Sequence, residues 1–161
     1  SAPRESVMLD DPQIVRTDTQ PTAVIHLTIP RAEIQDLMGP AISEVMAAVA
    51  AQGMAPAGPV FSHHLRMDPA MFDFEVGVPV RVPISAMGRV SPSQLPAATV
   101  ARVVYRGTYD GLGPAWAEFS AWLADEGHAT APDLWESYVS GPEWNKDPAT
   151  WRTELNRPLI R

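Results

Sequence analysis

The chain contains an internal repeat, and this repeat restricts the folds that it can adopt. The segments GPAISEVMAAVAAQG at 39–53 and GPAWAEFSAWLADEG at 113–127 align at an offset of 113 − 39 = 74 residues. Farther along, Asp-Pro-Ala at 68–70 matches the same three residues at 147–149, at an offset of 147 − 68 = 79. Two copies of one unit predict a pseudo-symmetric fold with a seam between its halves, where a small-molecule site is expected to form.

The length of the chain indicates that the two copies belong to one domain. With 161 residues, 45% of them hydrophobic, the chain can bury a substantial core once but not twice. We therefore expect a single domain over residues 1–161. Repeat one is expected at about 13–82, a linker rich in proline and serine at 83–96, and repeat two at about 97–161.

Composition excludes several classes of function. Twelve Lys and Arg against nineteen Asp and Glu give a net charge of −7 with no basic run, which argues against direct nucleic-acid binding. The absence of cysteine excludes disulfides, thiol nucleophiles and cysteine-based zinc sites. The most apolar stretch, at 45–51, is too short to span a bilayer, so no membrane partner is expected and a cytoplasmic location is the default.

Each copy predicts one amphipathic helix flanked by strands. Apolar residues recur at helical spacing in both copies, at Met38, Ile42, Val45 and Val49 and at Leu112, Trp116, Phe119 and Leu123. Gly-Pro pairs at 39–40 and 113–114 are expected to open the helices, and Gly53 and Gly127 to end them.

Strand-like segments complete each unit. They are expected at 14–29, 60–67 and 71–82 in the first copy and at 98–105, 134–139 and 153–160 in the second. Each copy thus follows the order strand, helix, strand, strand. The predicted fold is α+β, with a curved antiparallel sheet and two helices packed on it.

These motifs carry a resemblance to a known family. The duplicated unit, with GP at the second helix, WESYVSGP at 135–142 and TELNRPL at 153–159, resembles the GyrI-like small-molecule-binding family over about residues 13–160. That family includes effector-binding domains of AraC- and MerR-type multidrug-responsive transcription activators. The resemblance implies a ligand pocket between the halves, with aromatic walls and glutamates at its base. It also implies a fused or separate transcription-regulator partner.

Two glutamates are the leading candidates for the site. In the strand at 134–139, Glu136 and Tyr138 share one face, while Trp135 and Val139 point to the other. The resemblance implies that Glu136 and Glu154 both face the pocket. The alternative from the residues alone is that these glutamates are exposed on a solvated face of the sheet.

Aromatic residues concentrate in the second copy, so we expect that copy to dominate the site. Trp116 and Phe119 lie on the helix stripe and are expected to pack in the core, with ligand contact as the alternative where that helix face borders the seam. Trp144 lies in an insertion as either a lid or a packed loop tip. The first copy has Ser62 in place of Glu136 and His64 in place of Tyr138. The predicted ligand contacts are Glu136, Tyr138, Glu154, Trp135, Trp151, Trp144, Tyr105, Tyr109, Phe61 and His64.

No metal or cofactor is expected. The histidines at 26, 63, 64 and 128 lack ligand spacing, and the adjacent His63 and His64 must point to opposite faces of a strand. Glycine-rich phosphate loops and a GxSxG nucleophile elbow are also absent.

Three functions remain open. The first is a stand-alone sensor or sequestering protein for amphipathic, cationic or planar aromatic small molecules, which are lipophilic partners. The second, implied by the resemblance, is a hydrolase that opens strained cyclopropane-containing natural products, with Glu154 or Glu136 as the base and Tyr138 or Tyr105 as the proton donor. The third, ranked last, is inhibition of a protein such as gyrase by an acidic surface.

Overall fold

A computed structural model describes residues 9–142 and 145–160, which form one sheet with two helices. The helices are α1 (Ile34–Ala51) and α2 (Leu112–Asp125), and three short 3-10 helices, η1 (Arg31–Glu33), η2 (Tyr109–Gly111) and η3 (Pro148–Thr150), precede α1, α2 and β8. The strands are β1 (Gln13–Thr17), β2 (Gln20–Pro30), β3 (Phe61–Met67), β4 (Met71–Pro79), β5 (Ser91–Leu95), β6 (Ala98–Arg106), β7 (Leu134–Ser140) and β8 (Arg152–Pro158).

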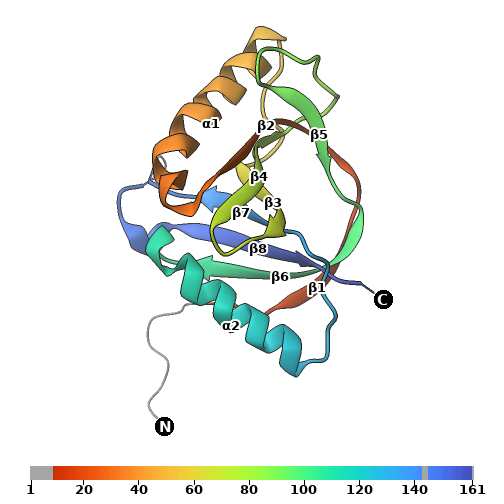
Figure 1. Ribbon diagram of the computed structural model, residues 1–161, viewed down its shortest axis with the longest axis vertical. Coiled ribbons are helices and arrows are strands. Elements are labelled where there is room, and N and C mark those ends of the chain that lie inside the picture. The colour runs from red at the N-terminus through yellow and green to blue at the C-terminus, as the bar shows by residue number, and fades with distance from the viewer. Residues whose placement is uncertain (1–8, 143–144, 161) are drawn as a thin grey trace.

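The order of the strands reflects the repeat. The sheet runs β1-β6-β8-β7-β3-β4-β2-β5, with every neighbouring pair antiparallel. Its inner six strands are β6, β8 and β7 from the second copy followed by β3, β4 and β2 from the first, which is a mirrored order. Figure 1 shows the resulting curved sheet, with α1 over one half and α2 over the other. The predicted α+β fold with a curved antiparallel sheet and two packed helices is confirmed.

The two halves meet where β3 pairs with β7. Ser62 lies opposite Glu136, and these residues are equivalents at the repeat offset of 136 − 62 = 74. On either side, Phe61 pairs with Ser137 and His63 with Trp135. The pseudo-twofold axis therefore passes through the Ser62–Glu136 pair.

Three hydrophobic clusters hold this architecture together. One lies between α1 and strands β2 and β4, and a second lies between α2 and strands β6 and β8. The third fills the opposite face, where the curled sheet brings together residues of β2, β3, β5, β6 and β7. Alternation along β2 illustrates the division, because Ile25 packs in the α1 cluster and its neighbour Val24 in the third cluster.

The edges of the sheet differ from the sequence prediction. The segment predicted as one strand at 14–29 is divided into β1 and β2, and β1 pairs with β6 of the other copy. The segment predicted as a linker at 83–96 contains β5, which pairs with β2. Each copy thus has one more strand than expected, and that first strand completes the other half of the sheet.

The helices agree with the prediction except at the start of α1. Both end just before a glycine with positive φ, 73° at Gly53 and 74° at Gly127. Helix α1, however, begins at Ile34, so Pro40 lies inside it and cannot donate a hydrogen bond to the carbonyl of Asp36. Packing of the partly buried Ile34 and Met38 on the α1 cluster offsets this loss.

Close packing of β4 against β2 generates a prediction about Gly77. A Cβ at Gly77 would lie 1.9 Å from the carbonyl oxygen of Ala23, whereas a Cβ at Gly39 of α1 would have no neighbour within 4 Å. We expect Gly77→Ala to lower the free energy of unfolding by at least about 2 kcal/mol. The control Gly39→Ala should change it by less than about 1 kcal/mol, because the helix preference of alanine opposes the contact of its new methyl group with the ring of Pro40. Urea titrations followed by circular dichroism measure both, and equal stability of the two variants would contradict the described packing.

Candidate functional site

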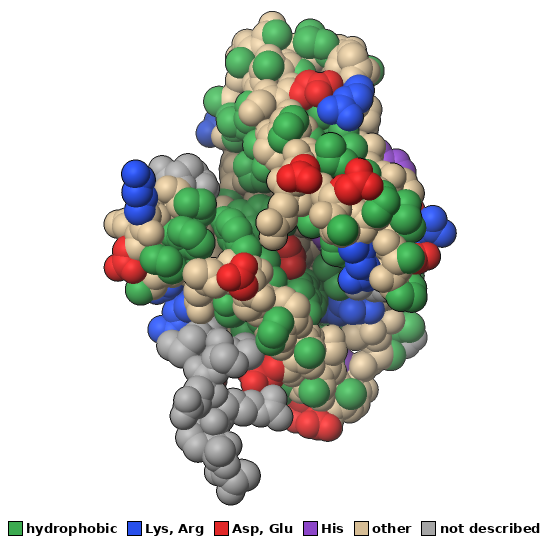
Figure 2. Space-filling model, turned by 60° about the vertical axis from the view of Figure 1, so that its left-hand side comes forward, with side chains coloured by type: hydrophobic (Ala, Val, Ile, Leu, Met, Phe, Trp, Pro, Cys, Tyr) green, Lys and Arg blue, Asp and Glu red, His purple; other side chains and the backbone are tan. Residues whose placement is uncertain are grey.

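A large cavity lies at the seam, between the N-terminal halves of α1 and α2 and over strands β3 and β7. Its volume is about 1180 Å³. Figure 2 shows a recess near the middle of the face, with hydrophobic side chains on its walls. The cavity therefore occupies the place that the repeat predicts for a small-molecule site.

Equivalent residues of the two copies form much of the wall. Residues at the repeat offset of 74, or of 79 after the five-residue insertion in the second copy, line the cavity together. Five such pairs are Met38 and Leu112, Ile42 and Trp116, Val60 and Leu134, His64 and Tyr138, and Phe72 and Trp151. In three of these pairs the second copy supplies a larger aromatic ring or a phenol. The cavity is thus symmetric in position and asymmetric in chemistry.

Glu136 is the centre of a buried hydrogen-bond network on this wall. The indole Nε1 of Trp116 donates to one carboxylate oxygen at 2.6 Å, and the phenol of Tyr138 donates to the other at 2.8 Å. Because the phenol has a single proton, the hydroxyl of Ser62, 2.8 Å from the Tyr138 oxygen, acts as donor to Tyr138. The four side chains come from α2, β7 and β3, so the network crosses the seam.

Burial controls the ionisation of this network. Glu136 is only 9% exposed. Desolvation raises the pKa of Glu136 above its ordinary value, and the hydrogen bonds from Trp116 and Tyr138, which stabilise the carboxylate, offset only part of this rise. Desolvation also raises the pKa of Tyr138 well above its ordinary value, so its phenol remains neutral. The carboxylate has no ion-pair partner among the described residues.

His64 occupies the matching position in the first copy. It is 6% exposed, stacks on Phe74 with ring centroids 4.9 Å apart, and meets Phe72 edge-on at 5.1 Å. Desolvation, with smaller contributions from His63 and Arg31, lowers the pKa of His64 to about 4. The imidazole is therefore neutral at pH 7.

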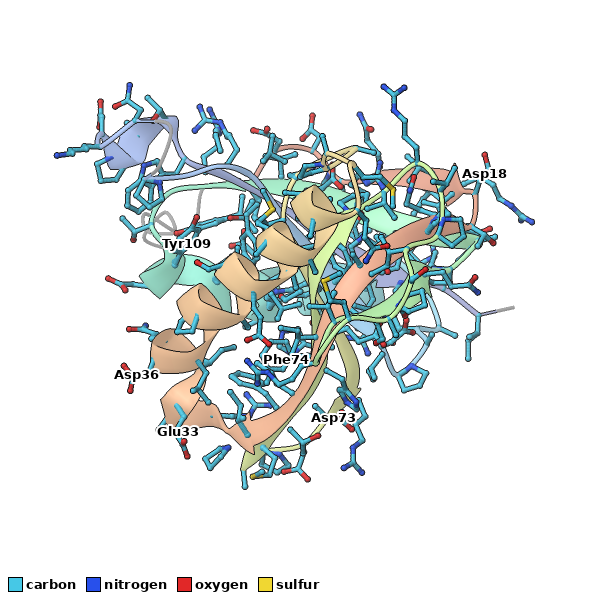
Figure 3. The ribbon with its side chains drawn as sticks, turned by 90° about the horizontal axis from the view of Figure 1, so that it is seen from above. Asp18, Glu33, Asp36, Asp73, Phe74 and Tyr109 are labelled. Atoms are coloured by element: carbon cyan, nitrogen blue, oxygen red, sulfur yellow. The ribbon has the colours of Figure 1, made fainter. Side chains whose placement is uncertain are left out.

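Aromatic rings of the second copy form one side of the cavity. Tyr109 meets Tyr138 at 5.8 Å and Trp151 at 5.5 Å between ring centroids. In Figure 3, Tyr109 lies on the side of the molecule where Glu33 and Asp36 mark the N-terminal end of α1. The rings of Tyr109 and Trp151 thus offer flat apolar surface beside the buried carboxylate.

Comparison with known families identifies the domain. The GyrI-like small molecule binding domain matches residues 10–159. This chain belongs to the GyrI-like family. The predicted family is therefore confirmed. No curated protein sequence matches the chain.

Solved structures share the fold of this GyrI-like domain. The C-terminal domain of EcmrR has a TM-score of 0.80 and 24% identity, covering 94% of this chain and 98% of that domain. In the EcmrR–DNA complex the same comparison covers 57% of the EcmrR chain, so this chain spans little more than half of that regulator. SAV2435 bound to tetraphenylphosphonium has a TM-score of 0.72 and 11% identity, covering 94% of each chain. A hydrolase from Listeria innocua has a TM-score of 0.61 and 11% identity, covering 92% of this chain and 91% of that one.

The structure brings five of the predicted ligand contacts to the wall of the cavity. These are Glu136, Tyr138, His64, Tyr109 and Trp151. Four others do not line it, and Trp144 lies outside the described residues. Trp135 and Phe61 pack in the third cluster, on the opposite face of the sheet. Tyr105 packs in the α2 cluster and donates from its phenol to the carbonyl of Thr108 at 2.7 Å.

Glu154 requires a correction. Register places Leu155 of β8 opposite Glu136, so the neighbouring Glu154 points to the other face of the sheet. There its carboxylate lies 3.3 Å from Nε of Arg102 and 3.3 Å from the amide nitrogen of Asn156. The two glutamates therefore do not share a pocket.

The predicted ligand contacts omit several wall residues. Trp116, expected in the core with ligand contact as the alternative, packs on the α2 cluster and also lines the cavity. Phe72 is not among the predicted ligand contacts, although the repeat aligns it with Trp151, which is one of them. Arg31 and Arg157 also line the cavity, and neither belongs to an equivalent pair on its wall.

The described residues contain no group of three or more His, Cys, Asp or Glu side chains that could hold a metal ion. Among the helices of residues 9–142 and 145–160, none combines the length and the apolar character needed to cross a membrane.

The environment of His64 generates a pH prediction. The unfolded chain protonates His64 near pH 6.5 and the folded protein only near pH 4, so the free energy of unfolding falls as the pH drops through this window. We expect the parent to lose up to roughly 3 kcal/mol more than His64→Gln between pH 7 and pH 4. Urea unfolding at several pH values measures the difference, and parallel profiles would contradict the burial of a neutral imidazole.

Proposed function

We propose that the cavity binds lipophilic cations with planar aromatic rings and that Glu136 supplies the opposing charge. The observation that carries this proposal is a buried carboxylate on a mainly apolar wall, held by two neutral donors and without a cationic partner among the described residues. Such a carboxylate has lost most of its hydration without gaining an ion pair. A bound cation would restore the missing charge interaction.

The energies of these interactions favour an aromatic cation over a neutral aromatic molecule. At about 4 Å and an effective dielectric constant near 20, the Coulomb attraction to Glu136 is about 4 kcal/mol before the ligand's desolvation is subtracted. Contacts with aromatic faces, such as those of Tyr109 and Trp151, add roughly 0.5–2 kcal/mol. Tyr138 and Trp116 hold the carboxylate in place, which reduces the entropy lost on binding.

The biological role that we assign is sensing or sequestration of such molecules. Tetraphenylphosphonium, bound in the structure of SAV2435, is a lipophilic aromatic cation of the proposed class. EcmrR combines a domain of this fold with DNA binding in one chain. We assign ligand capture to the present domain, and any control of transcription to a fused or separate DNA-binding partner, since a net charge of −7 disfavours direct contact with DNA.

Hydrolysis of strained cyclopropane-containing compounds is the alternative, and the hydrogen bonds favour binding instead. A general base must direct a lone pair at a water molecule, and a proton donor must face the substrate. Here both oxygens of Glu136 accept protein donors, and the single proton of Tyr138 points at Glu136. Each carboxylate oxygen keeps a second lone pair that could accept a water proton, so catalysis would require the Tyr138 proton to turn from Glu136 to the substrate.

Two glutamate variants test the function. We expect tetraphenylphosphonium to quench tryptophan fluorescence of the parent, and Glu136→Gln to raise its Kd at least tenfold, because the attraction of the carboxylate is lost. The matched control is Glu154→Gln, which removes a carboxylate from the opposite face and should leave the Kd within about twofold.

Thermal unfolding of both variants verifies that they fold. Equal affinity in Glu136→Gln and the parent would contradict the role of Glu136.

Mass spectrometry after incubation with a cyclopropane-containing electrophile should show unchanged compound. A product that gains one water and is lost in Glu136→Gln would favour the hydrolase.

A further inference from the structure

A second polar group lies in the first-copy half of the cavity, around Phe72. The guanidinium of Arg31 lies 4.5 Å from the centroid of the Phe72 ring, and the imidazole of His64 meets the same ring at 5.1 Å. All three residues line the cavity. This cluster, which we call the Phe72 group, is separate from the network of Glu136.

His64 presents unused hydrogen-bonding capacity to the cavity. Its side chain is more than nine-tenths buried, yet its ring nitrogens bond to none of the described residues. The buried side-chain atoms without a partner include Nδ1 of His63 but no atom of His64, so the nitrogens of His64 are not sealed inside the protein. Because His64 lines the cavity, a ligand can reach this neutral imidazole.

Arg31 also retains donors for a ligand. Its Nε donates to the carbonyl of Asp68 at 2.8 Å, which fixes the side chain across Phe72. The Asp68 carboxylate instead accepts the amides of Ala70 and Met71, and Arg31 forms no ion pair with a described residue. The terminal nitrogens of Arg31 therefore remain available to an oxygen acceptor.

Among the described residues, the cavity wall carries two positively charged and two negatively charged side chains. Arg31 and Arg157 contribute positive charge, and Asp110 and Glu136 contribute negative charge. Arg157 is held by two bonds to the carbonyl of Ala131, at 3.1 and 2.9 Å. That leaves Arg31 as the cationic side chain best placed to meet a ligand in the described wall, opposite in charge to Glu136.

We infer that the cavity selects amphoteric ligands, with the cationic centre at Glu136 and a carboxylate at Arg31 and His64. This inference rests on the proposed cation site and adds a second, anion-binding subsite to it. Ladder pairing places Ser62 opposite Glu136, and His64 lies two residues farther along β3. Two residues of strand span about 7 Å and neighbouring strands lie about 5 Å apart, so this diagonal is about 8 Å and the ligand should hold its two charges about that far apart.

Three xanthene dyes test the inference because they share one ring system and differ in charge. Rhodamine B carries a cationic xanthene and a carboxylate, its ethyl ester keeps the cation and loses the anion, and fluorescein has the carboxylate without the cation. Fluorescence anisotropy at pH 7 gives the Kd of each dye. We expect the parent to bind rhodamine B at least fivefold more tightly than the ester.

Substitutions in the Phe72 group test which of its residues produce the preference for rhodamine B over the ester. Arg31→Gln should abolish the preference for rhodamine B over the ester while leaving ester binding intact or stronger. His64→Phe, which keeps a ring on Phe74 but removes the nitrogens, should reduce the preference about threefold. The control Arg89→Gln removes an exposed arginine that pairs with Glu44 and should change neither Kd.

The outcomes separate the two proposals. If the parent binds the ester at least as tightly as rhodamine B, the carboxylate subsite is overturned and the cation site stands. A second outcome is that Glu136→Gln leaves the Kd of the ester unchanged, while Arg31→Gln still weakens the binding of rhodamine B and fluorescein. In that case the cation site fails and the carboxylate subsite stands. If the preference for rhodamine B persists in Arg31→Gln, the assignment to Arg31 is wrong.

Discussion

The pairing of β3 with β7 is the interaction on which the rest of the structure depends. It joins the two copies into one sheet and sets Ser62 opposite Glu136 on the pseudo-twofold axis. Because α1 and α2 pack on opposite halves of this sheet, their separation above the central strands follows from the same pairing. The β3–β7 pairing therefore creates the space for the cavity, and these two strands form its floor.

Departure from symmetry gives this cavity its chemistry. A glutamate on both copies at the axis would place two buried carboxylates side by side, which like-charge repulsion disfavours. With Ser62 on one strand and Glu136 on the other, the hydroxyl instead supports the phenol that holds the carboxylate. The difference between His64 and Tyr138 similarly leaves one half with a neutral ring whose N–H can donate to a ligand and the other half with a donor already in use. A duplicated scaffold can therefore carry two unlike ends of one site.

The sequence predicted the shared face of Glu136 and Tyr138, because that inference needs only the two-residue period of a single strand. It failed for Glu154, since the face of β8 depends on its register with β7, which no local pattern encodes. The start of α1 was missed because burial of Ile34 and Met38 overrides the usual position of proline in a first turn. Strand β5 was not predicted for a similar reason. Part of the proline-rich segment at 83–96 forms a strand because it pairs with β2, which is distant in the sequence.

The exchanged edge strands bear on how such a domain could have arisen. Strand β1 is the first strand of the first copy but pairs with β6 of the second, and β5 is the first strand of the second copy but pairs with β2 of the first. In this arrangement the first strand of one copy has its partner in the other, so two identical chains with one copy each could form the same sheet by exchanging their first strands. The geometry is that of a strand-swapped homodimer joined into one chain. Once the two copies shared a gene, each position on the axis could mutate separately, which an identical pair of subunits does not permit.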